Sequence, residues 1–262
     1  SSNPINLIDC NVFIVCVPTP VDQYNKPDLE PIKNATLEIS KIININNSNK
    51  KKIIIYESTV FPGVTEEICG EILKRELSCD IGELFVLGYS PERISPGIQD
   101  EKKITEIIKI TSGSDPDTAD WIDKFYGDFI TEGTYLAKSI KIAEAAKIVE
   151  NIQRDLNIAL MNELSLLFSY MKIDTNDVID AAATKWNFLP FRPGLVGGHC
   201  VGVDPYYLAY AAEKFNVHTE LIKSGRRIND NMAGWIARQI VRKYISTSSS
   251  SCTKNILLLG AC

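Results

Sequence analysis

The sequence predicts an α/β protein with a parallel sheet, because short apolar segments alternate with helical patterns in the first part of the chain. Three segments are apolar throughout and rich in β-branched or aromatic residues, which is typical of strands buried on both faces of a parallel sheet. These segments cover residues 11–17, 52–56 and 84–89. Helical patterns at residues 29–45 and 64–77 separate them. The alternation predicts right-handed crossover connections between the strands.

The rest of the chain is predicted to be mainly helical. A fourth strand is expected at residues 104–112, and Asp115 is placed to cap a helix that begins at Pro116. The longest helical pattern covers residues 138–171, and Asp174 precedes a short helix that ends near residue 183. The expected elements that follow are helices up to residue 215 and at residues 220–245, a serine-rich linker at residues 246–253, and a buried strand within residues 254–262.

Length and composition describe an ordinary globular protein. The 262 residues are 45% hydrophobic and carry a net charge of -5, so no basic excess points to a nucleic-acid partner. Seven cysteines without a CxxC pair and only two histidines predict neither a metal site nor a disulfide framework. No apolar run is long enough for a membrane helix and the first residues do not resemble a signal peptide, so a cytoplasmic location is expected.

The expected long helix carries an apolar stripe and, on its other side, a polar row. The stripe consists of Ile142, Ala145, Val149, Ile152, Leu156 and Leu160 at three- and four-residue spacing. We expect so long a helix to bridge domains or to pair with a second copy of itself. The polar row is Lys147, Asn151 and Arg154. It is either a solvated face, with Glu144 and Glu150 pairing to Lys147, or one wall of a binding site.

Polar side chains follow the three expected strands at their carboxyl ends. Thr19 lies beyond the first strand, Ser58 and Thr59 follow the second, and Glu92 and Arg93 follow the third. Ligands of open parallel sheets bind at these ends, so the pattern predicts a shared ligand crevice. The alternative is that each residue only completes a turn or a helix cap.

A glycine-rich loop at residues 194–208 surrounds one cysteine. Cys200 lies among four glycines, and Asp204 follows four residues later. Glycine allows a positive φ or a close approach of the backbone to a ligand, which suits a nucleophile loop. A free thiol is more commonly a small buried hydrophobe, so spacing alone leaves both interpretations open. His199 directly precedes the thiol, but sequence neighbours commonly point apart, so we do not expect a Cys–His pair.

The twelve residues GGHCVGVDPYYL of this loop closely resemble the catalytic-cysteine signature of the nucleotide-sugar 6-dehydrogenases. The resemblance implies NAD-dependent oxidation of a sugar alcohol to a carboxylate, through a thiohemiacetal and a thioester on Cys200. It implies that Lys147 is the catalytic lysine of the family and Asn151 a substrate-binding asparagine. Asp204 matches an aspartate used near the thiol, with capping of the following helix as the alternative.

The same resemblance covers the ends of the expected strands. Glu92 matches the family glutamate that assists water during thioester hydrolysis, together with Thr19. Thr19 and Thr59 match positions that contact NAD. The implied catalytic residues are therefore Cys200, Lys147, Glu92, Asn151 and Asp204.

Local residues indicate which branch of the family the chain resembles. UDP-glucose dehydrogenases carry a second glutamate and a lysine where this sequence has Pro96 and Val203. Residues 90–97 instead resemble the branch that acts on UDP-N-acetylhexosamines, and residues 186–198 resemble its UDP-N-acetylglucosamine or N-acetylgalactosamine enzymes of surface-polysaccharide synthesis. UDP-N-acetylmannosamine and UDP-glucose are the alternatives. The expected substrate-binding residues are Arg93, Ile94, Lys147, Asn151, Arg154, Lys185 and Gly197, with Arg154 making a bidentate contact to the sugar or its diphosphate.

The layout of the family implies a partial Rossmann-type parallel sheet, a long central helix in an all-helical dimerisation domain, and the first strand of a second Rossmann-type domain. We therefore expect a fragment that forms a homodimer. Its domains would be residues 1–135 for NAD, 136–245 for substrate and dimerisation, a linker at 246–253, and the strand at 254–262. The fingerprint GxGxxG occurs nowhere in the 262 residues. Alternatives are a dimerisation core without activity and a cysteine hydrolase built on Cys200 and His199.

Overall fold

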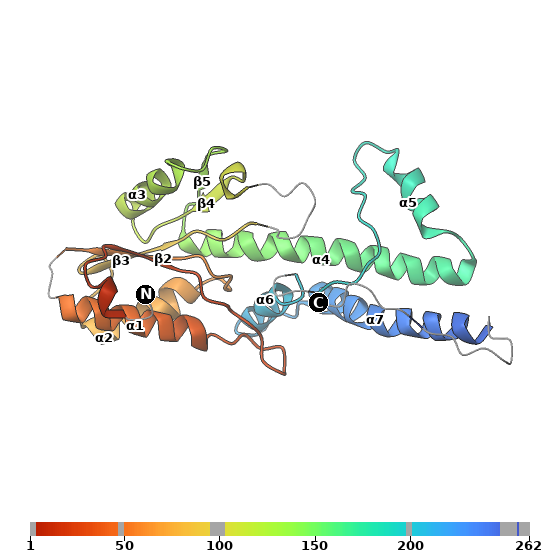
Figure 1. Ribbon diagram of the computed structural model, residues 1–262, viewed down its shortest axis with the longest axis horizontal. Coiled ribbons are helices and arrows are strands. Elements are labelled where there is room, and N and C mark those ends of the chain that lie inside the picture. Colours follow the sequence, from red (N-terminus) through yellow and green to blue (C-terminus); the bar gives the residue numbers. More distant parts are fainter. Residues whose placement is uncertain (1–3, 47–49, 95–102, 198–200, 247–255, 257–262) are drawn as a thin grey trace. The chain divides into compact units, whose positions relative to one another are not determined.

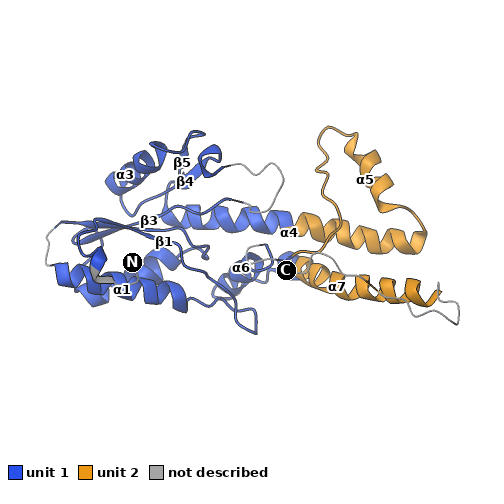
Figure 2. Ribbon diagram, viewed as in Figure 1, with its two compact units in different colours: residues 1–154, 197–223 blue, residues 155–196, 224–262 orange. Residues whose placement is uncertain are grey.

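The computed structural model of the chain describes residues 4–46, 50–94, 103–197, 201–246 and 256 (Figure 1). The chain forms two compact units (Figure 2). The first unit consists of residues 1–154 and 197–223, and the second of residues 155–196 and 224–262. Two of the three boundaries fall inside helices, α4 (Ile140–Met171) and α7 (Glu220–Ser246), and the third lies between Val196 and Gly197.

The first unit is built on a three-stranded parallel sheet, which confirms the predicted α/β fold. Its strands, in the order in which they pair, are β1 (Val12–Val15), β2 (Lys52–Tyr56) and β3 (Phe85–Tyr89). In the register of the sheet, Ile14 lies opposite Ile55, and Ile55 lies opposite Gly88. Every residue of β3 is buried, as the continuous apolar pattern predicted.

Helices cover both faces of this sheet (Figure 1). On one face lie α1 (Glu30–Asn46), which connects β1 to β2, and α2 (Glu71–Leu77). The predicted helix at residues 64–77 begins with π-helical turns at Val64–Gly70 and continues as α2. On the other face lies α3 (Pro116–Gly127), capped by Asp115, whose carboxylate accepts a hydrogen bond from the Thr118 amide at 2.9 Å. The predicted cap is confirmed.

The absence of a side chain at Gly88 allows α3 to pack closely on β3. A Cβ atom built on Gly88 would lie 2.2 Å from Cδ1 of Ile122. Ile122 belongs to a buried cluster with Ile55, Tyr126 and Ile130. The position therefore requires glycine for packing, since its φ is not in the left-handed region.

The expected fourth strand at residues 104–112 is shorter than predicted. A single 3-10 turn occupies Ile104–Glu106, because the Glu106 carboxylate accepts a hydrogen bond from the Lys103 amide at 3.1 Å and favours a capped turn. The strand β4 is limited to Lys109–Thr111 and pairs in parallel with β5 (Thr134–Leu136). The sequence did not predict β5, since three residues are too few for a periodic pattern.

The second unit is helical and contains a buried polar network. It consists of the later part of α4, α5 (Thr175–Ala183) and most of α7. Asp155 on α4 accepts a hydrogen bond from the Arg226 guanidinium of α7 at 2.6 Å, and Asn229 donates to the same carboxylate at 2.7 Å. Asn162 donates to Asn229 at 2.7 Å. The network joins the two long helices by directional contacts in addition to apolar packing.

The short helices α5 and α6 (Asp204–Glu213) were also predicted from the sequence. The Asp174 carboxylate accepts a hydrogen bond from the Asn176 amide at the start of α5, as predicted. The first of the last two expected helices ends earlier, since α6 covers Asp204–Glu213. The linker at 246–253 and the strand at 254–262 lie outside the described residues, apart from Ser246 and Ile256. No helix in the described ranges combines the length and the apolarity that a membrane span requires.

Candidate active site

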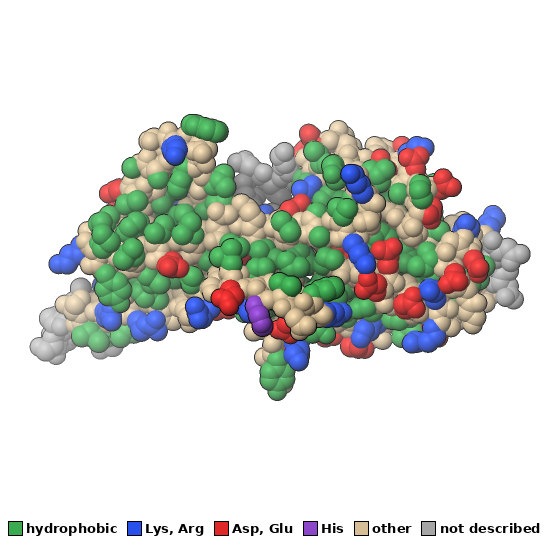
Figure 3. Space-filling view, turned by 180° about the vertical axis from the view of Figure 1, so that it is seen from behind, with side chains coloured by type: hydrophobic (Ala, Val, Ile, Leu, Met, Phe, Trp, Pro, Cys, Tyr) green, Lys and Arg blue, Asp and Glu red, His purple; other side chains and the backbone are tan. Residues whose placement is uncertain are grey.

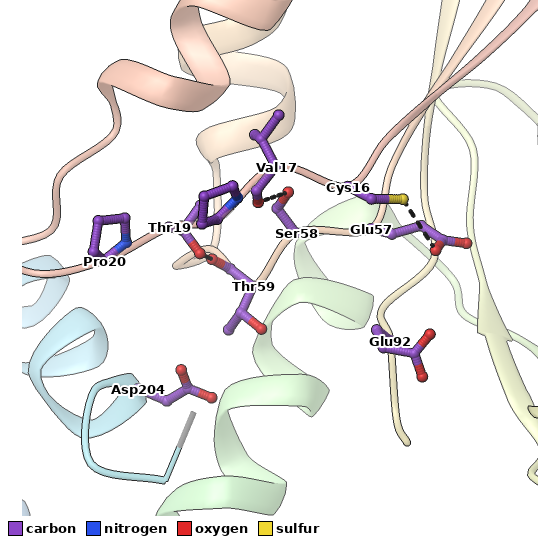
Figure 4. A pocket seen from close by; sticks show the side chains of 10 residues that line it. Cys16, Val17, Thr19, Pro20, Glu57, Ser58, Thr59, Glu92 and Asp204 are labelled. Atoms are coloured by element: carbon purple, nitrogen blue, oxygen red, sulfur yellow. Dashed lines mark hydrogen bonds between the residues drawn. The ribbon is translucent and has the colours of Figure 1, made fainter. Parts of the chain in front are cut away.

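A cavity lies at the carboxyl ends of β1 and β2 in the first unit, where the sequence predicted a ligand crevice. Residues from several elements line it, and Figure 4 shows them from close by. The lining residues are Cys16, Val17, Pro18, Thr19, Pro20, Glu57, Ser58, Thr59, Glu92 and Asp204. Four predicted site residues, Thr19, Thr59, Glu92 and Asp204, therefore line one cavity although they are far apart in the sequence.

Hydrogen bonds join the two segments that leave β1 and β2. The Thr19 hydroxyl donates to the backbone carbonyl of Thr59 at 2.7 Å. The Ser58 hydroxyl donates to the carbonyl of Val17 at 2.6 Å (Figure 4). The resulting wall combines threonine oxygens with the apolar side chains of Val17 and Pro18, and this combination fits part of a dinucleotide, with its flat rings and its polar ribose and amide groups.

Asp204 contributes a buried carboxylate from the first residue of α6. Its side chain is 2% exposed, and it accepts a hydrogen bond from the Asn151 amide of α4 at 2.5 Å. Burial raises the pKa of Asp204 to about 6, against the opposing effects of the Asn151 hydrogen bond and the Lys147 charge. The cap position of α6 is Val203 and no side chain bonds there, so the interpretation of Asp204 as a helix cap is wrong.

The polar row on α4 is largely buried. Lys147 is 7% exposed and Asn151 is 4% exposed, whereas Arg154 is exposed. The solvated-face interpretation is therefore wrong for the first two residues. Its proposed partners are engaged elsewhere, because Glu144 accepts hydrogen bonds from backbone amides of the segment after β2, and Glu150 pairs with Arg93. Asn151 instead bonds to Asp204, and the Lys147 charge opposes the rise in the pKa of that carboxyl group.

Glu92 lies on the segment that follows β3. One of its carboxylate oxygens accepts hydrogen bonds from the backbone amides of Arg93 and Ile94, each at 2.6 Å. The other predicted residues of this segment, Arg93 and Ile94, are thus immediate neighbours of Glu92. The Arg93 guanidinium bonds to Glu150 on α4 and to the carbonyl of Ile108.

Sequence reasoning missed a buried ion pair beside the cavity. The Lys109 ammonium of β4 lies 2.9 Å from the Glu57 carboxylate, with side chains 4% and 13% exposed. Tyr126 donates to Glu57 at 2.5 Å, and the Cys16 thiol lies 3.5 Å from it. Burial and the nearby Glu57 charge raise the pKa of Cys16 to about 11, so this thiol stays protonated at neutral pH. Two features of the sequence could have indicated this ion pair. Glu57 directly follows a buried strand, and Lys109 lies within the apolar segment 107–110.

Two further predicted site residues, Gly197 and Lys185, are not among the described residues that line this cavity. Cys200 and His199 lie outside the described residues. Gly197 is exposed and belongs to the first unit, whereas Lys185 is exposed and belongs to the second unit.

Comparison with known protein families gives two matches that adjoin along the chain. Residues 2–130 match the NAD binding domain of the UDP-glucose/GDP-mannose dehydrogenase family. Residues 141–231 match the central domain of the same family. The two domains together account for most of the sequence.

Individual proteins are similar over nearly the whole chain. A UDP-N-acetyl-D-glucosamine 6-dehydrogenase of Pseudomonas aeruginosa is 50% identical over 97% of this chain and 59% of its own length. One of Salmonella typhi is 49% identical over 96% of this chain and 58% of its own length. The solved structure of a UDP-D-ManNAc dehydrogenase from Pyrococcus horikoshii superposes with a TM-score of 0.84 at 30% identity, over 94% of this chain and 56% of that one. The chain thus spans less than two thirds of the relatives that it matches.

Proposed function

Because the chain belongs to the UDP-glucose/GDP-mannose dehydrogenase family, we propose that the complete gene product is an NAD-dependent UDP-sugar 6-dehydrogenase. It would take the C6 hydroxymethyl group of a UDP-N-acetylhexosamine to a carboxylate in a four-electron oxidation. The observation that carries the proposal is the buried hydrogen bond between Asn151 and Asp204, one helical turn from the buried Lys147, at a cavity that Asp204 and Glu92 both line. Groups of this kind are unfavourable to bury, and their grouping suits a reaction that develops charge on oxygen.

UDP-N-acetylglucosamine is our first choice of substrate. Relatives of that name share about half of their aligned residues with this chain, whereas UDP-N-acetyl-D-mannosamine dehydrogenases share 30–33%. Pro96 and Val203 stand where a UDP-glucose enzyme is expected to carry charged residues. The alternatives, in order, are UDP-N-acetylmannosamine and UDP-glucose. A product of this type is a uronic acid, which we propose serves surface-polysaccharide synthesis.

In the proposed reaction, Cys200 links two successive oxidations. When bound, NAD accepts one hydride in each of them. The alcohol first loses a hydride and its hydroxyl proton to become an aldehyde, and the Cys200 thiolate adds to the aldehyde carbon to form a thiohemiacetal. Loss of a second hydride and the remaining hydroxyl proton leaves a thioester. Water then adds to the thioester carbon, the C–S bond breaks, and the carboxylate and the thiolate are released.

We assign roles to the predicted site residues as follows. The Lys147 ammonium lowers the pKa of the Cys200 thiol and stabilises the oxyanions, with Asn151 as a neutral donor beside it. Asp204 holds Asn151 and Lys147 in place, and Glu92 with Thr19 orients the attacking water. Thr19 and Thr59 hold NAD. The substrate is held by Arg93, Ile94, Lys147, Asn151, Arg154, Lys185 and Gly197.

We also propose that the protein is a cytoplasmic homodimer that pairs through its helical region. Several apolar side chains of the second unit are more than half exposed, and hydrophobic side chains gather over α4, α5 and α7 in the view of Figure 3. They include Leu160, Leu167, Tyr170, Trp186, Leu189, Leu195 and Val241. So large an apolar surface favours a partner, since monomers rarely expose one. We keep the domain division proposed from the sequence, with boundaries after residues 135, 245 and 253, and place the dimer contacts in residues 136–245.

The test measures NADH formation by the complete gene product with a panel of UDP-sugars. We expect about two NADH per sugar, with one N-acetylhexosamine preferred. Cys200→Ser is expected to abolish this turnover, whereas the matched control Cys79→Ser, at a half-buried cysteine outside the cavity, is expected to keep it. Absence of NADH from every UDP-sugar, with self-association in sedimentation, would favour the dimerisation core without activity. Thiol-dependent hydrolysis without nicotinamide would favour the cysteine hydrolase.

A further inference from the structure

The segment Pro91–Ile94, which carries Glu92, has little regular structure to hold it. It follows β3 directly and precedes residues outside the described ranges. Its backbone is fixed at Ser90, whose buried hydroxyl donates to the carbonyl of Ile110 at 2.7 Å. Beyond Ser90, side chains from other elements must fix the segment, because Glu92 bonds only to the amides of its own neighbours among its described hydrogen bonds.

Arg93 supplies the contact that joins this segment to α4. Its Nη2 atom lies 2.8 Å from Oε1 of Glu150, and its Nε atom lies 3.2 Å from Oε2 of the same carboxylate. The pair is therefore bidentate, the geometry in which an arginine fixes orientation as well as distance. Its Nη1 atom donates to the carbonyl of Ile108 at 2.7 Å. The Nε and Nη1 atoms of this guanidinium thus donate hydrogen bonds within the protein, and its Nη2 atom lies within ion-pair distance of Glu150.

The position of Glu150 on α4 gives this contact its significance. Glu150 directly precedes Asn151, which bonds to Asp204, and lies three residues after the buried Lys147. A displacement of the Arg93–Glu150 pair would therefore change the distance between Glu92 and the buried end of the cavity.

We infer that Arg93 and Glu150 form a positioning pair, which fixes the Glu92 carboxylate relative to Lys147 and Asn151 on α4. The inference deepens the proposed function and rests on it for the role of Glu92. The Arg93 guanidinium then acts on the protein, and the proposed contact of Arg93 with substrate is made by its backbone. Neither side chain of the pair is fully exposed, at 27% for Arg93 and 34% for Glu150, so the contact is partly shielded from solvent.

Lys109 of β4 also holds this segment. Lys109 donates to the carbonyl of Pro91 at 3.3 Å while it pairs with Glu57. The residue before Glu92 and the residue after it are thus each bound by a charged group. Glu92 therefore sits between two ion pairs, one from β2 and β4 and the other from α4.

The test compares Glu150→Gln with Glu67→Gln in the complete gene product. Glu67 forms an ion pair with Lys141, which also lies on α4, but neither residue lines the cavity, so this variant is a matched control. We expect Glu150→Gln to lower kcat by about ten-fold or more and to keep KM for the UDP-sugar within about two-fold. The double variant Arg93→Glu with Glu150→Arg, which restores an ion pair, is expected to recover kcat to within about three-fold of the parent.

Hydrogen exchange of the Arg93 and Ile94 amides provides a readout that does not depend on turnover. Both amides donate to Glu92, so loss of the positioning pair is expected to speed their exchange by about ten-fold in Glu150→Gln and leave it unchanged in Glu67→Gln. Unchanged exchange and unchanged kcat in Glu150→Gln would overturn the inference. A rise in KM at constant kcat on replacing Arg93 by lysine would also overturn it, because the guanidinium would then bind substrate. If the parent shows no turnover, the proposed function fails and the exchange result decides the pair alone.

Discussion

Replacement of Asp204 by asparagine is expected to make the protein more stable at neutral pH while it lowers activity. Asp204 is buried, and its pKa is raised from 3.8 to about 6. An asparagine has the same shape as a neutral aspartic acid, and its amide oxygen can accept the hydrogen bond from Asn151. The variant therefore resembles the protein with its carboxyl group permanently protonated.

The magnitude follows from the two pKa values. Below about pH 3 the Asp204 carboxyl is neutral in the folded and the unfolded chain, so folding includes no ionisation penalty. Between about pH 3 and pH 7 the unfolded chain ionises before the folded chain, and stability falls. Above about pH 7 the loss is complete. At roughly 1.36 kcal/mol for each pH unit, the loss amounts to about 3 kcal/mol. The Asp204→Asn variant does not lose this stability, because its side chain does not ionise.

The assay is urea unfolding of parent and variant at a series of pH values from 4 to 8. The difference in the free energy of unfolding, variant minus parent, is expected to rise by about 2 kcal/mol between pH 4 and about pH 7 and then to stay constant. Glu132→Gln, at an exposed position of the same unit, serves as the control and is expected to change stability by less than about 0.5 kcal/mol at every pH. A difference for Asp204→Asn that does not vary with pH would refute the reasoning.

Two further predictions concern the frame that carries the site. Asp115→Ala removes the acceptor of the Thr118 amide at the start of α3 and is expected to lower the free energy of unfolding by about 1 kcal/mol, measured by urea unfolding. Gly88→Ala is expected to lower it by about 2 kcal/mol or more, because the added Cβ would lie 2.2 Å from a methyl group of Ile122. Gly127→Ala, where no atom lies within 4 Å of the added Cβ, is expected to be neutral or slightly stabilising in thermal unfolding; a similar loss in both glycine variants would contradict the packing argument.

The parts of the fold that the sequence predicted are those that local chemistry decides. The buried strands at residues 52–56 and 84–89 appear within one residue of their expected bounds, because continuous β-branched and aromatic runs have few other stable environments. The caps Asp115 and Asp174 were predictable because each completes the first turn of its own helix. In contrast, β5 exists only through pairing with a strand more than 20 residues earlier, which no local pattern records.

The sequence alone could not predict which side chains of the site pair with each other when they lie far apart along the chain. Thr19 and Thr59 were expected at one crevice, since both follow strands of one sheet. Nothing in the sequence indicates that Glu57 forms an ion pair with Lys109, or that Glu150 pairs with Arg93 and not with Lys147. Such choices depend on which side chains the fold brings together, over separations of more than fifty residues.

The long helix α4 shows why amphipathic patterns mislead at a functional site. Its apolar stripe was the natural candidate for the core, yet Ile142, Val149 and Leu160 are each about half exposed. Its polar residues Lys147 and Asn151 are buried instead. The exposed stripe is explained if a partner covers it, as the homodimer proposal states.

The buried polar face of α4 requires a different explanation. Burying an ammonium group and a carboxylate costs more free energy than their mutual attraction usually returns, so apolar residues at Lys147 and Asp204 would give a more stable helix contact. The burial of Asp204, which raises the pKa of its carboxyl group, is the source of this penalty. The arrangement thus lowers stability, yet it places hydrogen-bond donors and a carboxylate beside a cavity. A catalytic site that stabilises charge requires such a grouping. The gain in stability expected for Asp204→Asn, paired with a loss of turnover, would therefore support the catalytic role of this face more directly than a loss of turnover alone.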